Sequence, residues 1–145
     1  MRKVWLAVVV LVLALAGCQS HQAQADPVES GLDQEFNLYG GQEATISGAN
    51  LSLRFTDVIE DSRCPTQVEC VWTGQARIAV VATQGQAEPT TMEFNTNPAP
   101  GQTRQTAEVG AYTVELRSLD PYPQTPDDAR ALEDYSATLL VRKTA

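Results

Sequence analysis

The sequence predicts an all-β fold, a small antiparallel β-sandwich or barrel of about eight strands. Apolar and polar residues alternate along 51–56 and again along 112–117. Clusters of glycine, proline and asparagine separate these segments from other short, strand-like ones. Alternation with a period of two is typical of strands with one buried face, and such a sheet needs a second layer to cover it. For a chain of 145 residues, a single folded domain is expected.

The strands are expected to follow one another with short turns between them. The turn signals are Gly40-Gly41, Gly48-Ala49-Asn50, Gly85, Asn97–Gly101 and Gly110. The expected strands are Glu35–Tyr39, Glu43–Ser47, Leu51–Thr56, Gly74–Ala82, Thr90–Asn95, Gln105–Val109, Tyr112–Arg117 and Tyr135–Arg142.

One segment near the C-terminus, Thr125–Asp134, has helical rather than strand character. Thr125 is a candidate N-cap, Pro126 suits the first helical position, and acidic residues follow in the first turn. One or two helical turns are therefore expected there.

The first eighteen residues have the features of a bacterial secretion signal. Arg2 and Lys3 precede a run of about 13 apolar residues, which is too short to span a bilayer as a mature helix. The run ends in Leu15-Ala16-Gly17-Cys18, which resembles the lipobox of bacterial lipoproteins. That resemblance implies cleavage before Cys18 and acylation of its thiol. The expected organisation is a signal peptide over 1–17, a lipidated N-terminus and flexible tether over 18–33, and a sandwich domain over 34–145.

The lipid bilayer, reached through acylated Cys18, is thus the first expected partner. Gln19 follows the cysteine, and for a Gram-negative host the resemblance to Gram-negative lipoproteins implies sorting to the periplasmic face of the outer membrane. The chain cut before Cys18 has 8 basic and 18 acidic residues, a net charge of −10. Nucleic acid is a poor partner for such an acidic surface.

The most specific feature of the domain is a loop with two cysteines, Asp61-Ser-Arg-Cys64-Pro-Thr-Gln-Val-Glu-Cys70-Val-Trp72-Thr-Gly74. Export makes a disulfide between Cys64 and Cys70 the natural expectation, since Cys18 is assigned to lipid. Closing this short ring contributes roughly 2.4 kcal/mol in the chain-entropy treatment.

The same loop carries a family resemblance. The pattern DSRCPxxxxCxWxGxAxV, present over Asp61–Ile78 with Ile in the last place, is similar to the signature of a family of small, uncharacterised bacterial secreted proteins and lipoproteins. The later Leu119-Asp-Pro-Tyr-Pro123 also resembles that family, so the similarity covers about Glu35 to Val141. The resemblance supports the expected fold and implies no particular activity.

Two interpretations of the loop remain open. In the structural one, Asp61 accepts hydrogen bonds from the following backbone or pairs with Arg63, Trp72 covers the sulfurs, and Gly74 relieves crowding. In the functional one, the loop presents Arg63, Gln67 and Glu69 to a partner, because binding residues concentrate on loops that a scaffold holds.

The residue inventory argues against cofactor enzymes and nucleophilic hydrolases. The single histidine, His21, falls in the expected tether, so Ser-His-Asp and Cys-His arrangements are not expected. Zinc-ligand spacing and a glycine-rich phosphate loop are also missing from the sequence, and we expect no cofactor. The acidic residues that offer pairs for glycosidase chemistry are Asp57, Glu60, Asp61, Asp120, Asp127, Asp128, Glu133 and Asp134. Two smaller sets, Asp57 with Glu60 and Asp61, or Asp127 with Asp128, are the candidates for converging on calcium.

The tyrosines divide into expected core and surface positions. Tyr112 and Tyr135 lie in expected strands, which favours packing into the core, whereas Tyr122 between two prolines is expected at the surface.

Together these features favour a non-enzymatic envelope lipoprotein whose domain serves as a binding or structural module. One alternative is an acidic inhibitor of a cationic, lysozyme-like hydrolase, suggested by the net charge and the stapled loop. Another alternative is a calcium-dependent adhesion or assembly domain, suggested by the acidic loops.

Overall fold

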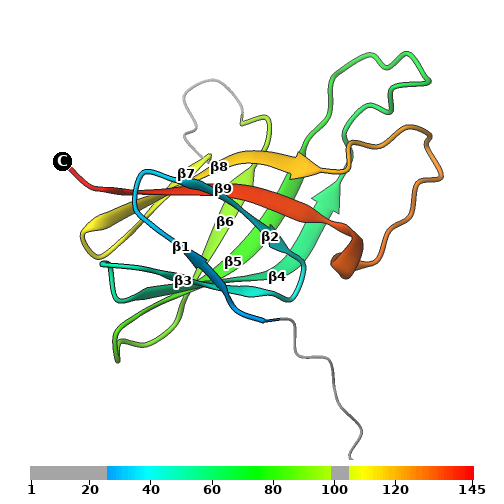
Figure 1. Ribbon diagram of the computed structural model, residues 1–145. Coiled ribbons are helices and arrows are strands. Elements are labelled where there is room, and N and C mark those ends of the chain that lie inside the picture. The colour runs from blue at the N-terminus through cyan, green and yellow to red at the C-terminus, as the bar shows by residue number, and fades with distance from the viewer. Residues whose placement is uncertain (1–25, 99–104) are drawn as a thin grey trace, which may run out of the picture.

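Two β-sheets packed face to face form the domain in the computed structural model, which describes residues 26–98 and 105–145 (Figure 1). One sheet has the order β1-β3-β4-β5-β6 and the other the order β2-β9-β8-β7. The strands are β1 (Val28–Ser30), β2 (Glu35–Tyr39), β3 (Glu43–Ile46), β4 (Leu51–Asp61), β5 (Ala76–Gln84), β6 (Thr90–Asn95), β7 (Thr106–Val109), β8 (Tyr112–Asp120) and β9 (Ser136–Lys143). The expected all-β sandwich is confirmed, and the two sheets do not close into a barrel.

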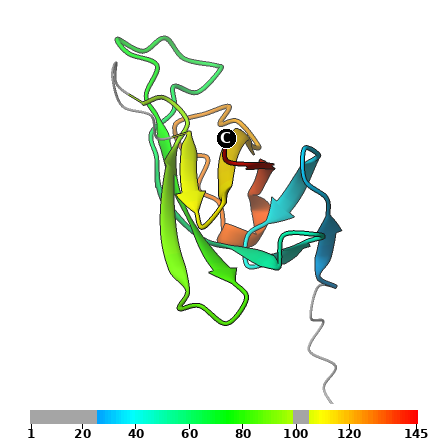
Figure 2. The same cartoon turned by 90° about the vertical axis from the view of Figure 1, so that its left-hand side faces the viewer.

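The core lies between the sheets and is built by the alternation seen in the sequence. In β4, Leu51, Leu53 and Phe55 are buried, while the residues between them are more exposed. From the opposite sheet, Leu38 of β2 and Leu139 of β9 are also buried. Figure 2 shows the β5–β6 hairpin in green beside the β7–β8 hairpin in yellow, which places the two layers against each other. Each sheet therefore supplies the apolar cover that the other requires.

The domain begins earlier than the sequence predicted. Val28–Ser30 falls within the expected flexible tether, yet it forms β1 and pairs in parallel with β3, Val28 opposite Ala44 and Ser30 opposite Ile46. The backbone amide of Asp33 also donates to the carbonyl of Val141 at 2.8 Å. Expecting a tether as far as residue 33 was thus wrong for its last residues. The expected signal peptide over 1–17, Cys18 and His21 lie outside the described residues.

Of the one or two helical turns expected within Thr125–Asp134, the structure has one, the 3₁₀ turn η1 (Leu132–Asp134). Thr125 is not its N-cap, because the turn begins after Ala131. The Asp128 carboxylate accepts hydrogen bonds from the backbone amides of Gln124 and Thr125, at 2.7 and 3.3 Å, and so closes a separate turn there. Local capping by an aspartate competes with helix formation at this point.

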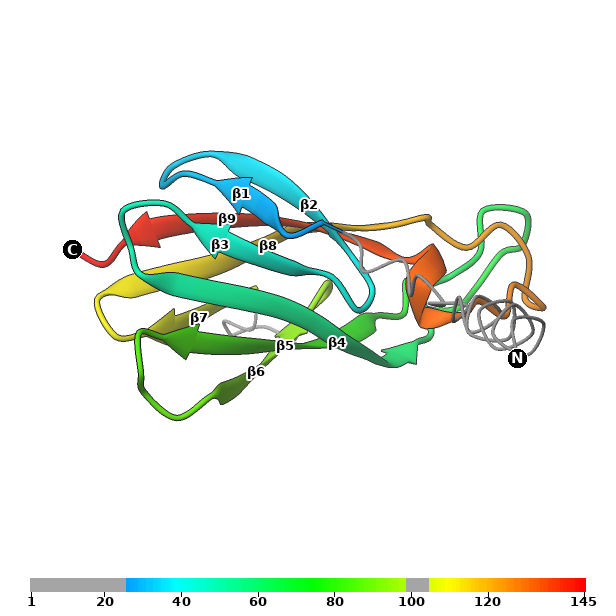
Figure 3. The same cartoon turned by 60° about the horizontal axis from the view of Figure 1, so that its bottom comes forward.

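The two ends of the sandwich differ. Leu51 pairs with Gln84 at one end of the β4–β5 ladder, and Asp61 pairs with Ala76 at the other. The segment between β4 and β5, residues 62–75, extends from this second end beside residues 121–131, and the C-terminus lies at the opposite end (Figure 3). Within the described residues, no helix is long and apolar enough to cross a membrane.

Candidate functional site

The segment 62–75, which we call the disulfide loop, forms a stapled protrusion. Cys64 and Cys70 are joined by a disulfide with their Cα atoms 6.0 Å apart, as the sequence predicted. The amide of Cys64 donates to the carbonyl of Thr73 at 2.8 Å and ties the two arms of the loop together. The amides of Thr66 and Gln67 donate to the carbonyls of Pro123 and Gln124, at 3.1 and 3.0 Å. The loop is thus fixed both to itself and to the neighbouring segment.

Arg63 is the centre of the contacts at the base of this loop. Its Nε and Nη2 atoms donate to the two carboxylate oxygens of Asp61 at 2.8 and 2.7 Å, which makes the ion pair bidentate. Nη1 donates to the carbonyl of Leu119 at 2.6 Å, and Nη2 also donates to the carbonyl of Pro121 at 3.0 Å. The guanidinium carbon lies 4.9 Å from the ring centroid of Tyr122, a cation–π contact. Arg63 therefore connects the end of β4 to the end of β8.

Asp61 extends this connection to β9. The hydroxyl of Tyr135 donates to a carboxylate oxygen of Asp61 at 3.1 Å, and Tyr135 itself is buried. Burial opposes ionisation of the Asp61 carboxyl, but the hydrogen bonds and charge of Arg63, with the Tyr135 hydroxyl, outweigh it and lower its pKa. Burial and the adjacent Asp61 charge raise the pKa of Tyr135. We call Asp61, Arg63, Tyr122 and Tyr135 the Arg63 cluster.

These contacts correct the functional interpretation of Arg63. That interpretation had Arg63 presented to a partner, but its side chain is 6% exposed and all of its nitrogens donate within the domain. Its role is to hold the loop in place, and the predicted pairing with Asp61 is the one observed. Gln67 and Glu69, the other two expected partner residues, are exposed.

The tip of the loop exposes apolar side chains that sequence reasoning missed. Every residue from 66 to 73 is exposed. Val71 is fully exposed, Trp72 is 79% exposed and Val68 is 39% exposed. The structural interpretation expected Trp72 to cover the disulfide sulfurs, and its exposure shows that it does not. No pattern in the sequence marks this tryptophan as exposed, because an apolar side chain beside a disulfide is ordinarily buried.

Gly74 does relieve crowding, as expected. Its backbone has φ +68°, and a Cβ there would collide with the backbone carbonyl of Ser62. A glycine is required by both the left-handed conformation and the close approach of the two loop arms.

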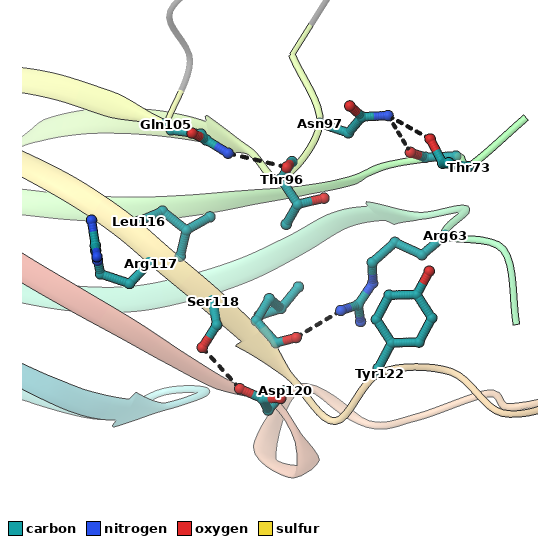
Figure 4. Close-up of a pocket in the computed structure, with 12 residues that line it drawn as sticks. Arg63, Thr73, Thr96, Asn97, Gln105, Leu116, Arg117, Ser118, Asp120 and Tyr122 are labelled. Carbon is teal, nitrogen blue, oxygen red and sulfur yellow. Dashed lines mark hydrogen bonds between the residues drawn. The ribbon is translucent and has the colours of Figure 1, made fainter. Parts of the chain in front are cut away.

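A cleft of about 460 Å³ lies between the disulfide loop and β8, and Arg63 forms part of its wall (Figure 4). Most of its polar groups bond to one another. Asn97 donates to Thr73 and to the carbonyl of Gly74, at 2.8 and 2.9 Å, and Ser118 donates to Asp120 at 2.9 Å.

The acidic residues considered for calcium do not form a metal site. Asp57, Glu60 and Asp61 line a second cleft of about 320 Å³, but Arg130 lines it too and Asp61 is paired with Arg63. Across residues 26–98 and 105–145, no group of three or more histidine, cysteine or acidic residues is placed to hold a metal ion.

Asp128 has a structural task instead. It accepts from two backbone amides, from the Thr125 hydroxyl at 3.1 Å and from Arg130 at 3.2 Å. The backbone hydrogen bonds of Gln124 and Thr125 lower the pKa of its carboxyl.

The tyrosines occupy the positions expected of them. Tyr135 is buried, Tyr112 packs against the core, and Tyr122 is 43% exposed at the surface.

Comparison with known proteins adds no family assignment: no protein-family model, no curated protein and no solved structure matches the chain.

The Arg63 cluster predicts a pH-dependent stability difference. Asp61→Asn breaks a buried ion pair and is expected to lower the free energy of unfolding by about 3 kcal/mol at neutral pH. A carboxyl whose pKa is lowered by folding stabilises the domain only while ionised, and this contribution is lost as the pH falls below about 4. Urea unfolding measured from pH 7 down to pH 3 gives the free energy of unfolding of both proteins. The difference between wild type and Asp61→Asn in this free energy is expected to become smaller as the pH falls. Asp127→Asn, at an exposed position, is the control. If its free-energy difference from wild type shrank equally with acid, the pH dependence would not come from the Asp61–Arg63 pair.

Two glycine-to-alanine substitutions distinguish two causes of instability at Gly74. One cause is the left-handed backbone conformation, and the other is the close approach of the Ser62 carbonyl. Gly48 also has a positive φ, +81°, but a Cβ there meets nothing within 4 Å. Gly48→Ala is expected to cost about 1 kcal/mol from backbone strain alone. Gly74→Ala is expected to cost clearly more, because the Ser62 carbonyl must also move. Equal losses in the free energy of unfolding, measured in urea, would show that the two arms of the loop are not in tight contact.

Proposed function

We propose that this protein is a membrane-anchored bacterial envelope lipoprotein whose sandwich domain is a non-enzymatic binding or structural module. The observation that carries the proposal is the disulfide loop, whose tip is exposed along 66–73 although its base is fixed by a disulfide and buried hydrogen bonds. Ordering a loop costs conformational entropy, and a loop that is already held avoids that cost when it binds. A rigid, solvent-facing tip is the usual way in which a β-scaffold presents a binding surface.

The lipobox-like sequence before Cys18 supports the anchoring half of the proposal. Each acyl methylene that enters the bilayer contributes about 0.8 kcal/mol, so several chains hold a protein stably where one chain holds it reversibly. Attachment at the periplasmic face of the outer membrane fits a Gram-negative host, because Gln19 follows the cysteine. The resemblance of the 61–78 pattern to bacterial secreted proteins and lipoproteins supports the same placement.

The two alternatives differ in what supports them. An inhibitor of a cationic hydrolase is supported by the net charge of −10 expected after cleavage, 18 acidic against 8 basic residues, and by the rigid loop. A calcium-dependent domain has no comparable support, since no three acidic residues converge within residues 26–98 and 105–145, and Asp61 and Asp128 are engaged with arginines and backbone amides. We therefore favour the membrane-anchored binding or structural module.

Replacing the anchoring thiol tests the proposal directly. Cys18→Ala is expected to move the protein from the membrane fraction to the soluble fraction, because the acyl chains can no longer be attached. Fractionation of the host envelope with immunodetection measures the distribution, and intact-mass analysis of the wild type checks for cleavage before Cys18 and for added lipid. The double variant Cys64→Ser/Cys70→Ser serves as the control, since it removes the other two cysteines, which form the disulfide, and leaves Cys18 in place. Continued sedimentation of Cys18→Ala with membranes would refute lipid anchoring.

A further inference from the structure

The loop tip is an apolar surface that residues 26–98 and 105–145 leave exposed. Val71 and Trp72 are consecutive, and their side chains are respectively fully and 79% exposed, with Val68 nearby at 39%. Glu69 is the single charged residue between Pro65 and Gly74, in a chain with 18 acidic residues. Scattered apolar residues are common on protein surfaces, but an adjacent valine and tryptophan on a rigid protrusion mark a surface that meets another apolar phase.

The described chain also begins toward this end of the sandwich. β1 runs parallel to β3 and β3 antiparallel to β4, with Val28 opposite Ala44 and Ala44 opposite Leu53. β1 therefore runs opposite to β4, which runs toward the disulfide loop. Val28, the first residue of β1, is at the end of that strand nearer the loop. Figure 3 shows that the loop and the first described residues are both directed away from the C-terminal end.

The distance from this point to the anchor is short. Asp26 is the eighth residue after Cys18, and eight residues reach at most about 28 Å when fully extended. The stretch of β4 from Leu53, level with Val28, to Asp61 is on the order of 26 Å long. These two lengths are comparable, so the extended segment brings Cys18 to the level of Asp61, at the base of the loop from which the tip projects.

We propose that the tip formed by Val68, Val71 and Trp72 docks into the interfacial layer of the same membrane that holds acylated Cys18. This inference rests on the proposed lipid anchor and names the bilayer surface as the partner of the loop. Tryptophan favours the membrane–water interface, where its ring is buried while its N–H stays hydrated. The anchor raises the effective concentration of the tip at the surface, so a contact too weak to bind the free domain suffices. The expected surface is zwitterionic, because Glu69 and the acidic domain are repelled by anionic lipid.

Trp72 is itself the probe for this contact. The chain has two tryptophans, Trp5 and Trp72, and cleavage before Cys18 removes the first. The lipid-modified protein, purified from membranes, is reconstituted into phosphatidylcholine vesicles with or without bromine on the acyl chains. Brominated lipid is expected to reduce Trp72 emission at least about twofold, because bromine quenches an indole held at the interface. Val71→Asp, which leaves Trp72 in place, is expected to abolish most of this quenching.

Two controls use the opposite end of the sandwich. Gln86 is exposed in the turn after β5, at the end of the β4–β5 ladder away from the loop. In the double variant Trp72→Phe/Gln86→Trp, bromine is expected to leave the emission unchanged, and Gln86→Asp is expected to leave the quenching of Trp72 unchanged.

Vesicle flotation in the same samples separates the two proposals. Protein that floats with the vesicles but shows no bromine quenching of Trp72 would overturn the docking proposal, leave the anchor intact and point to a protein partner for the tip. Protein that fails to float would overturn the anchor and the docking proposal together.

Discussion

The buried ion pair between Arg63 and Asp61 is the interaction on which this end of the molecule depends. Their side chains are 6% and 11% exposed, and burying two charges costs solvation energy unless hydrogen bonds satisfy them. Here the carboxylate receives two bonds from the guanidinium and one from Tyr135, and the guanidinium reaches two further carbonyls. Asp61 belongs to one sheet, whereas Leu119 and Tyr135 belong to or adjoin strands of the other. One charged pair thus joins the two layers where apolar packing ends.

The position of the loop follows from this pair. Arg63 holds Leu119 and Pro121, and the next residues of the same segment, Pro123 and Gln124, accept the amides of the loop. The disulfide closes the loop on itself, and Gly74 permits its two arms to approach. Because the base of the loop is fixed, the tip keeps a defined position although it is exposed to solvent. That combination of a fixed base and an exposed apolar tip underlies both the binding function and the membrane contact that we propose.

Features that depend on local sequence patterns, such as the strands, were predicted from the sequence. Features that depend on contacts between residues distant in the chain were not. Alternation predicted the sandwich, and the count of thiols, in a chain expected to be exported, predicted the disulfide. The burial of Arg63 could not be predicted, because the carbonyls that satisfy it are more than fifty residues away along the chain. β1 has only three residues and depends on pairing with β3 rather than on a pattern of its own. The exposure of Trp72 was missed because residue type alone favours burial of such a side chain.

The central claim is that Arg63 fixes the disulfide loop, and amide hydrogen exchange in Arg63→Lys tests it most directly. Lysine keeps the positive charge but cannot form the bidentate pair and reach the two carbonyls at once. We predict faster exchange at the amides of Thr66 and Gln67, which bond to Pro123 and Gln124, with protection along β5 retained. Unchanged protection at Thr66 and Gln67 would contradict the account, because the loop would then be held without Arg63.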